Sequence, residues 1–271
     1  MRWLGDTPGR PREVHTPPLF FVGPSMVLGS QIVLTGDQFR HARVQRLTPG
    51  EVFRAVLGDT SYIARVEQVL ADRLVASIIG RTRVKEPEAK VHLYASLLKG
   101  QSFDVVVEKA TELGVASVTP VVTRRTIPRL DAKKAAERRA RWEKVARAAS
   151  EQSGRGSVPV IHGVVPFGDL MVRAAKIGAG SAASGTEGLV AGRRLLAYEH
   201  EGMTVDPHQA LAGATEASIL IGPEGGLDAD EVQEALDREF IPVSLGPYIL
   251  KAETAALAAV SLLIHYLSKQ A

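Results

Sequence analysis

The chain of 271 residues contains no cysteine, which excludes disulfide bonds, thiol nucleophiles and sulfur-ligated zinc sites. It also has no apolar run that approaches the roughly 20 residues of a membrane span. The alanine-rich segment 255–267 is too short for one and predicts a buried helix. Residues 1–18 carry arginines and prolines without the apolar region of a signal peptide, so we expect a disordered leader and a cytoplasmic protein.

Several common catalytic motifs are missing as well. The sequence has no Walker A motif, no G-x-G-x-x-G after a predicted strand, no H-E-x-x-H pair and no G-x-S-x-G elbow. Its seven histidines are scattered without the spacing of metal ligands. Common hydrolase and metal-site hypotheses therefore lose most of their support, and we predict no metal.

Positive charge gathers in two places, although the formal net charge is only +3. One cluster runs from Arg124 to Arg155, and a smaller one lies between Arg40 and Arg46. A run of charge is often no more than a solvated helix face. Two such clusters in two predicted domains nevertheless favour contacts with phosphate groups.

The first part of the chain predicts a small β-barrel over residues 19–84. Short alternating apolar runs there are separated by turn-forming residues, and only 37–47 looks helical. A polar strip follows, and we place a linker at 85–90.

From residue 91 to 271 the pattern changes to alternating strands and helices, which predicts an α/β domain with a mostly parallel sheet. Helices are expected at 102–113, with Ser102 as its cap and Gly114 just past its end, and at 132–153. Asp228 and Glu231 have the spacing of a capping box. A ligand should then bind at the carboxyl ends of the strands.

Two glycine-bearing segments stand out in this domain. ILIGPEGGL (219–227) and SLGPYILKAETAAL (244–257) each begin as a strand, break at a Gly-Pro pair and enter a helical pattern. Each alone is compatible with an ordinary tight turn. Together they would present backbone amides and carbonyls at one end of the sheet, which suits a small polar cofactor.

The two glycine-bearing segments belong to a longer series of segments whose order along the chain resembles that of the RsmE-type ribosomal RNA uridine-N3 methyltransferases of the SPOUT superfamily. The match includes FFVGPSM, LLKGQSFDVVVEKATELGV, RWEKVARAASEQSGR, LIGPEGGLDADEV and LGPYILKAETAAL, and it covers nearly everything from Leu19 onward. The resemblance implies an N-terminal PUA-like β-barrel that helps to hold RNA. It also implies a SPOUT α/β domain with a C-terminal deep trefoil knot, through which two copies pack as a homodimer.

The resemblance further implies methyl transfer from S-adenosylmethionine to N3 of one uridine in the small-subunit (16S) ribosomal RNA, within the assembled 30S subunit. The implied cofactor-binding residues are Leu220, Ile221, Gly222, Pro223, Gly225, Leu245, Gly246, Tyr248, Ile249, Leu250 and Thr254. The implied RNA-binding residues are Arg40, His41, Arg43, Arg46, Arg124, Arg125, Arg138, Arg139, Gln152 and Arg155.

This reaction needs a proton to leave N3 of uracil, because only then is the nitrogen lone pair a competent nucleophile. A carboxylate can act as the general base, and a cation can stabilise charge on O2 and O4. The candidate catalytic residues are Arg155, Glu199, Lys251 and Glu253. Structural roles are the alternative: Glu199 would tie down a loop, and Glu253 would interact with the positive end of the last helix.

The family commonly has arginine at the positions of Tyr248 and Lys251. These two positions therefore lack the guanidinium needed for bidentate recognition, although Tyr248 can stack on a base and Lys251 retains a charge. Two other functions remain open from the sequence. One is ribose 2'-O-methylation, as in another SPOUT branch, and the other is a ribosome-assembly factor without turnover.

Overall fold

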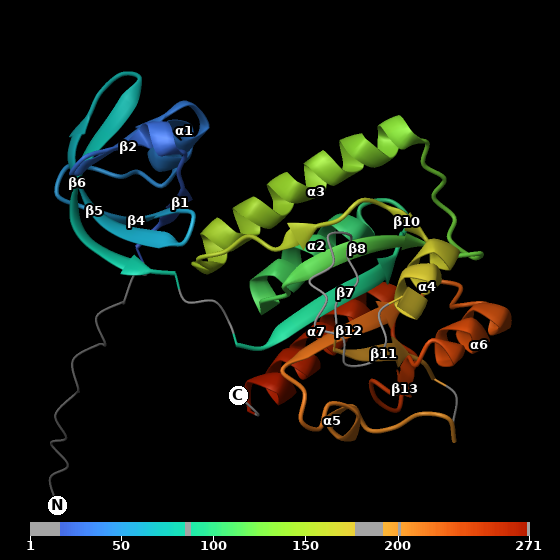
Figure 1. Cartoon of the computed structure of the whole chain (residues 1–271). Coiled ribbons are helices and arrows are strands. Elements are labelled where there is room, and N and C mark those ends of the chain that lie inside the picture. The colour runs from blue at the N-terminus through green and yellow to red at the C-terminus, as the bar shows by residue number, and fades with distance from the viewer. Residues whose placement is uncertain (1–16, 85–87, 177–191, 200–201, 270–271) are drawn as a thin grey trace, which may run out of the picture. The chain divides into compact units, whose positions relative to one another are not determined.

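The computed structural model describes residues 17–84, 88–176, 192–199 and 202–269. The chain divides into two compact units, Met1–Val84 and Lys85–Ala271 (Figure 1). The expected leader falls almost entirely outside the described residues, as does the first half of the expected linker. No helix in the described part of the chain is both long enough and apolar enough to cross a membrane.

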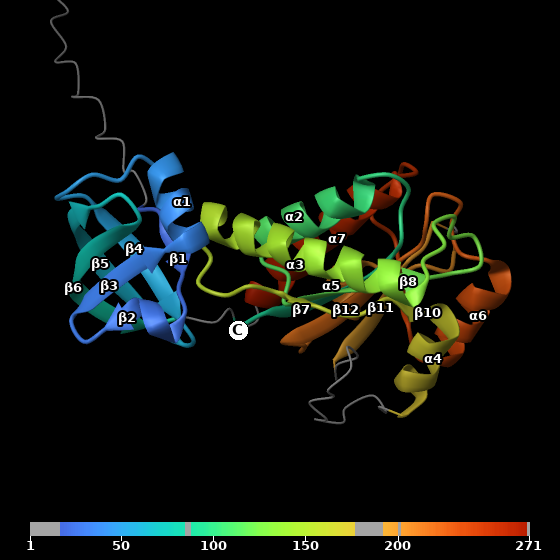
Figure 2. The same cartoon turned by 90° about the horizontal axis from the view of Figure 1, so that it is seen from above.

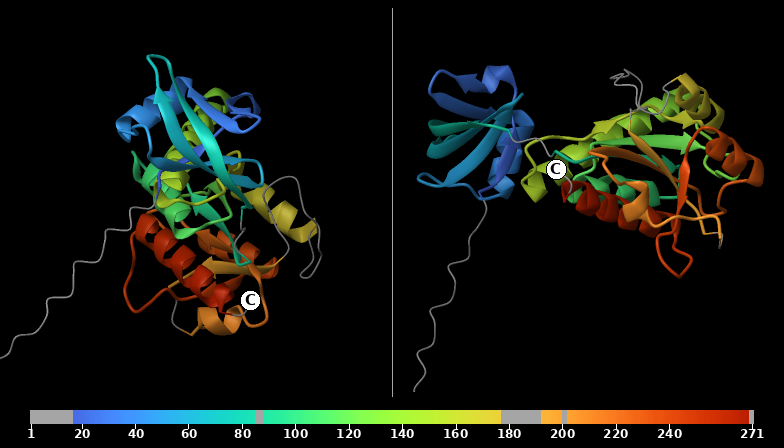
Figure 3. Two further views of the ribbon diagram at one scale, coloured as in Figure 1. Left: turned by 90° about the vertical axis from the view of Figure 1, so that its left-hand side faces the viewer. Right: turned by 60° about the horizontal axis from the view of Figure 1, so that its bottom comes forward.

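The first unit is a curled six-stranded sheet with one α-helix (Figure 3). Its strands follow the order β1-β4-β5-β6-β3-β2, with β1 parallel to β4 and the other pairs antiparallel. The elements are β1 (Leu19–Phe21), η1 (Pro24–Met26), β2 (Val27–Leu28), β3 (Gln31–Thr35), α1 (Gly36–Val44), β4 (Val52–Leu57), β5 (Thr60–Val69) and β6 (Arg73–Arg83).

Two irregularities in the β5–β6 register help this sheet to curl around its core. They lie at Ile63/Ala64 and Val66/Gln68, and such bulges bend a strand and increase its twist. The enclosed core contains Phe20, Leu34 and Phe53, none of which is accessible to solvent. The sheet agrees with the strand-rich sequence pattern, whereas the PUA-like relationship stays a prediction.

Helix α1 ends at Val44, three residues before the predicted end. Arg46 has a φ of 57°, a left-handed conformation that cannot continue a right-handed helix. The amide of Leu47 instead bonds to the carbonyl of Ala42 at 3.2 Å, which closes the helix with a wide turn.

The second unit is built on a parallel seven-stranded sheet, as the strand and helix alternation predicts. Strands β10, β8, β7, β12, β11 and β13 follow one another in that order, and β9 pairs with β8. Its strands are β7 (Lys90–Ser96), β8 (Ser117–Val122), β9 (Val160–Ile161), β10 (Val165–Pro166), β11 (Arg193–Ala197), β12 (Glu216–Ile221) and β13 (Ile241–Val243). Its helices are α2 (Ser102–Leu113), α3 (Ala132–Ser153), α4 (Phe167–Lys176), α5 (Pro207–Ala210), α6 (Ala229–Asp237) and α7 (Ala252–Ser268).

Helices cover both faces of this sheet (Figure 2). Leu93 of β7 and Ile219 of β12 pack with α2, α3 and α7 on one face. The adjacent residues Tyr94 and Leu220 pack with α4 and α6 on the other. Because successive side chains of a strand point to opposite faces, two buried faces require the nearly continuous apolar runs seen in these strands. The trefoil knot stays a prediction.

In the second unit, two predicted helix ends are confirmed and one differs. Gly114 closes α2 with a φ of 104°, and Asp228 with Glu231 forms the predicted capping box of α6. Ser102 is not the cap of α2, however, because Gln101 takes that position and the helix starts at Ser102. The start of α2 is instead tied to α3 through Asp104, which accepts a 2.8 Å hydrogen bond from Nε1 of the buried Trp142.

A buried histidine links three strands at the amino end of this sheet. His92 on β7 contacts Ser117 Oγ of β8 through Nδ1 at 2.7 Å and Glu216 Oε1 of β12 through Nε2 at 3.0 Å. Burial lowers the pKa of His92 below its ordinary value, although the hydrogen bond to Glu216 acts in the opposite direction. The neutral imidazole is therefore part of the folded state at neutral pH.

The lowered pKa predicts acid sensitivity. The unfolded chain binds a proton at His92 more readily than the folded one, so stability falls as pH drops below the unfolded-state pKa of about 6.5. Denaturant titrations of wild-type protein between pH 7.5 and 5 should show this loss, and His92→Gln should flatten it. The exposed His265, changed to Gln, is the control and should leave the pH dependence as it is. Identical pH profiles for wild type and His92→Gln would contradict this assignment.

Candidate functional site

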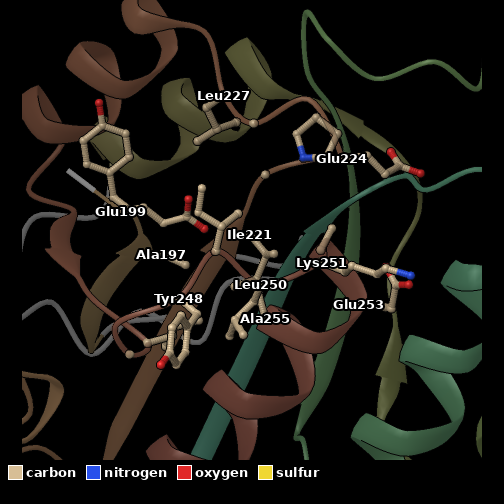
Figure 4. Close-up of a pocket in the computed structure, with 18 of the residues that line it drawn as sticks. Ala197, Glu199, Ile221, Glu224, Leu227, Tyr248, Leu250, Lys251, Glu253 and Ala255 are labelled. Atoms are coloured by element: carbon tan, nitrogen blue, oxygen red, sulfur yellow. The ribbon is translucent and has the colours of Figure 1, made fainter.

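Two loops that leave the carboxyl ends of β12 and β13 meet in one pocket of about 970 Å³ (Figure 4). We call residues 222–227 the first loop and residues 244–251 the second loop. The pocket is lined by Ser102, Ala197, Tyr198, Glu199, Ile221, Gly222, Pro223, Glu224, Gly226, Leu227, Leu245, Gly246, Tyr248, Ile249, Leu250, Lys251, Ala252, Glu253 and Ala255. A pocket of this size accommodates a drug-sized or cofactor-sized molecule. The two Gly-Pro segments therefore lie together at the carboxyl ends of the strands, as the sequence predicts.

Glycine is required at specific points of these loops. The amide of Gly226 bonds to the carbonyl of Pro223 at 2.8 Å in a tight turn, and Gly226 has a φ of 70°. A Cβ on Gly222 would lie 3.2 Å from the backbone nitrogen of Leu227, so the close approach of these segments leaves little room for a side chain. Gly246 in the second loop has a φ of 136°, which residues with a side chain rarely adopt.

The first loop is also held by the loop after β7. Ser96 Oγ, at the end of β7, donates to the carbonyl of Ile221 at 2.9 Å. The amide of Lys99 donates to Glu224 Oε1 at 3.0 Å. These bonds fix the first loop against a neighbouring strand end, so its backbone is positioned before any ligand arrives.

Carboxylates outnumber cations in the pocket lining. Glu199 follows β11, Glu224 lies in the first loop, and Glu253 lies in the first turn of α7. Lys251 is the N-cap residue of α7, and no side-chain cap bond is formed there. Figure 4 shows Lys251 and Glu253 extending toward the same side of the pocket. The arrangement favours a ligand that carries positive charge and leaves one ammonium group at the mouth.

Most of the predicted cofactor residues line this pocket. They are Ile221, Gly222, Pro223, Leu245, Gly246, Tyr248, Ile249 and Leu250, and they are joined by the catalytic candidates Glu199, Lys251 and Glu253. Leu220 does not line it, because its side chain alternates with that of Ile221 and packs into the core on the other face. Gly225 and Thr254 are exposed and also lie outside the lining.

Other lining residues are not among the site residues that the sequence predicts. Gly226 and Leu227 belong to the first loop, and Tyr198 precedes Glu199 at the end of β11, so position relative to the strand ends is a signal that would have found them. Ser102, at the start of α2, lies more than a hundred residues from either Gly-Pro segment, and its place in the lining follows only from the fold.

Arg155 is not part of the pocket in one chain. Its Nη1 lies 3.2 Å from the carbonyl of Thr111, near the end of α2, and its Nε lies 3.4 Å from Ser157 Oγ. Helix α2 begins after the carboxyl end of β7 and ends before the amino end of β8, so Arg155 and its neighbour Gln152 lie at the opposite end of the strands. Within a single chain, Arg155 therefore does not lie beside the other catalytic candidates.

The remaining basic candidates lie on several elements. In the first unit Arg40 pairs with Asp37, and Arg43 and Arg46 are exposed. His41 packs edge-on against Phe20, with ring centroids 5.1 Å apart.

Along α3, Arg139 pairs with Glu143 at 2.9 Å, and Arg141 is bound to Asp104 of α2 at 2.6 Å. Arg138 has no ion pair with any residue that the structure describes. Arg124 and Arg125 lie in the loop after β8, where both contact residues at or beside the first loop of the pocket.

Comparisons with known proteins show the family of this chain. A family model described as RNA methyltransferase domain matches residues 85–264. The chain is 30% identical to the ribosomal RNA small subunit methyltransferase E of Bacillus subtilis, over 84% of this chain and 87% of the relative. It is 31% identical to the protein of that name from Mycobacterium bovis, over 89% and 88% of the two chains. The chain belongs to this RsmE-type family of RNA methyltransferases.

Solved structures of relatives show the same fold. A ribosomal RNA small subunit methyltransferase E from Neisseria gonorrhoeae, bound to S-adenosyl methionine, matches with a TM-score of 0.75 and 26% identity, over 91% of this chain and 96% of that chain. A protein from Legionella pneumophila, solved in complex with the same cofactor, matches with a TM-score of 0.75 and 27% identity, also over 91% of this chain and 96% of that chain. Family membership confirms the resemblance seen in the sequence.

The backbone at Gly246 yields a direct prediction. Gly246→Ala forces a side chain onto a residue with a φ of 136°, so we expect a loss of about 1 kcal/mol or more in the free energy of unfolding. Gly163→Ala is the matched control, since Gly163 does not have positive φ and an added Cβ meets nothing within 4 Å. Urea titration measures both variants. Equal free energies of unfolding for the two variants would contradict this prediction, because the second loop would then accommodate the added side chain without any loss of stability.

Proposed function

We propose that this chain transfers the methyl group of S-adenosylmethionine to N3 of one uridine in small-subunit (16S) ribosomal RNA, with the assembled 30S subunit as substrate. The observation that carries the proposal is the meeting of the two Gly-Pro loops in one pocket. It is supported by the relative from Neisseria gonorrhoeae, which has S-adenosyl methionine bound and shares the fold over 91% of this chain.

The pocket residues fit this cofactor. Ile221, Leu245 and Leu250 offer apolar surface for an adenine ring, and the glycines of both loops expose backbone groups that can bond to its edge. The cofactor supplies an activated methyl group on a cationic sulfonium. Glu199, Glu224 and Glu253 provide the negative potential that such a cation favours. We propose the cofactor-binding role for the predicted residues that line the pocket.

The target uracil needs three things from the protein: removal of the N3 proton, stabilisation of the charge that develops on O2 and O4, and a fixed position. Glu199 and Glu253 are the candidate general bases. Lys251 is the candidate electrostatic stabiliser and acts as a point charge, because an ammonium group lacks the planar fork of arginine. The side chain of Tyr248 is 81% exposed at the pocket, where its ring can stack on the base.

RNA contacts are proposed on both units. The first unit, as a PUA-like barrel, presents Arg40, Arg43 and Arg46 on and after α1, and the second presents Arg138 and Arg139 on α3. Proteins of this kind gain much of their affinity for RNA from such phosphate contacts. The proposed substrate is consistent with a cytoplasmic location.

We further propose that the second unit carries the trefoil knot and that two copies pack through it. One chain holds Arg155 and Gln152 at the opposite end of its strands from its own pocket. A catalytic or RNA-binding role for these two residues at the pocket therefore requires a second copy of the chain.

Methyl mapping tests the function directly. Purified protein, S-adenosylmethionine and 30S subunits from cells that lack this activity should yield a single uridine whose base gains one methyl group by mass spectrometry. Because a methyl on N3 blocks base pairing, reverse transcription should stop at that uridine. Reactions with S-adenosylhomocysteine in place of the donor are the control, and parallel reactions with protein-free RNA identify the substrate. A methyl group on ribose, or cofactor binding without methyl transfer, would overturn the proposal in favour of one of the two other functions.

The basic face of α3 yields a second prediction. If Arg138 and Arg139 contact phosphates, changing both to Gln should weaken RNA binding and reduce the slope of log affinity against log salt by about one per lost contact. The control is Lys176→Gln at the end of α4, which removes a positive charge elsewhere in the same unit. A salt slope that stays at the wild-type value in the double variant would identify this part of α3 as a solvated surface.

A further inference from the structure

The loop after β8 reaches across the sheet to the first loop of the pocket. Strand β7 lies between β8 and β12, yet residues 124 and 125 contact the turn that follows β12 and the first turn of α6. The resemblance to the family implies RNA contacts for Arg124 and Arg125. In the structure both side chains instead bind the first loop and the start of α6.

Arg125 holds the first loop itself. Its Nη1 donates to the carbonyl of Gly225 at 2.9 Å, and its Nη2 lies 3.6 Å from Asp228 Oδ2. The aliphatic part of the side chain packs closely as well, because a Cβ on Gly225 would lie 3.6 Å from the Cβ of Arg125. Both neighbours of Gly225 line the pocket, so Arg125 supports this wall from behind.

Arg124 holds the start of α6, where the first loop ends. Its Nη1 lies 2.9 Å from Asp228 Oδ1 and 2.7 Å from Asp230 Oδ2, and its backbone amide donates to Glu231 Oε1 at 2.8 Å. Glu231 is only 4% exposed, and its other oxygen accepts from the amide of Asp228 at 3.0 Å. Each carboxylate of this turn is therefore engaged by the loop after β8, by the helix cap or by both.

The loop that carries these arginines is itself rigid. Thr123 and Thr126 are buried, and their hydroxyl groups lie 2.8 Å apart. Thr126 Oγ1 also accepts from the amide of Thr123 at 2.9 Å. Although the side chains of Arg124 and Arg125 are 58% and 51% exposed, their backbone is held by these threonine contacts, which lowers the entropic cost of keeping each guanidinium on its partner.

Charge explains why this position needs two arginines. Asp228 is the N-cap of α6, and Asp230 and Glu231 lie in its first turn, where the helix dipole favours each carboxylate but where the three repel one another. The two guanidinium groups offset that repulsion. The same contacts reduce the positive charge that remains to attract a phosphate.

From this geometry we infer that Arg124 and Arg125 are positioning residues of the cofactor pocket, which clamp the first loop and the start of α6 so that residues 222–227 keep the shape that S-adenosylmethionine requires. The inference rests on the proposed function for the identity of the ligand. It replaces the prediction that these two residues bind RNA.

The test compares three variants of the full-length protein. Arg125→Met keeps the aliphatic stem and removes the donor. We expect the cofactor Kd and KM to rise about three- to tenfold, since one hydrogen bond that holds the first loop at Gly225 is lost. The kcat at saturating cofactor and the salt slope of RNA binding should stay within about twofold of wild type. Arg125→Lys, which keeps a donor, should recover part of the affinity. Arg129→Met, an exposed arginine of the same loop without an ion pair among the described residues, should leave cofactor affinity unchanged.

The opposite pattern would overturn the inference. A reduced salt slope of RNA binding with an unchanged cofactor Kd would show that Arg125 contacts RNA phosphates and does not support the pocket.

If wild-type protein binds no S-adenosylmethionine, the proposed function fails, and the clamp is tested separately by amide hydrogen exchange. Exchange in residues 222–227 should accelerate in Arg125→Met and not in Arg129→Met. Equal exchange in the two variants would refute the clamp. Thermal unfolding of each variant checks that the fold is intact.

Discussion

The pairing of β11 with both β12 and β13 is the interaction on which the rest of the site depends. Leu195 and Leu196 pair with Ile219 and Leu220 on one side and with Ile241 and Pro242 on the other, all in parallel. Parallel pairing brings the carboxyl ends of all three strands to one edge. Pro242 is tolerated because β13 is the last strand of the sheet: its carbonyl accepts from the amide of Val205 at 2.9 Å, and no further strand requires the N–H that proline lacks.

This arrangement places two loops without regular structure close enough to share a ligand. Their shape then rests on local chemistry, which includes the positive φ of Gly226 and Gly246 and the bonds from Ser96 and Lys99. The loop after β8 adds a second support through Arg124 and Arg125. The first loop is thus held by its own strand, β12, and by the segments that follow β7 and β8. The second loop leads directly into α7.

Local signals in the sequence predicted the local structure well. The capping box at Asp228 and Glu231, the glycine that ends α2 and the parallel class of the sheet are all confirmed, because each depends on residues close together in the chain.

Contacts between distant segments could not be derived in this way. The basic pair at 124–125 looked like a phosphate site, since the carboxylates that engage it lie about a hundred positions away. The place of Arg155 likewise follows from the direction of α3 across the sheet, which charge patterning does not encode. For Leu220, strand alternation alone indicates a side chain on the face opposite to that of Ile221, in agreement with its place in the core.

The most direct test of this account is a crystal structure of the protein with S-adenosylhomocysteine, the demethylated form of the donor. The account predicts that the ligand lies between residues 221–227 and 244–251, with its sulfur facing the carboxylates of the pocket. A ligand bound at another place, or bound between these loops only after they separate, would contradict it.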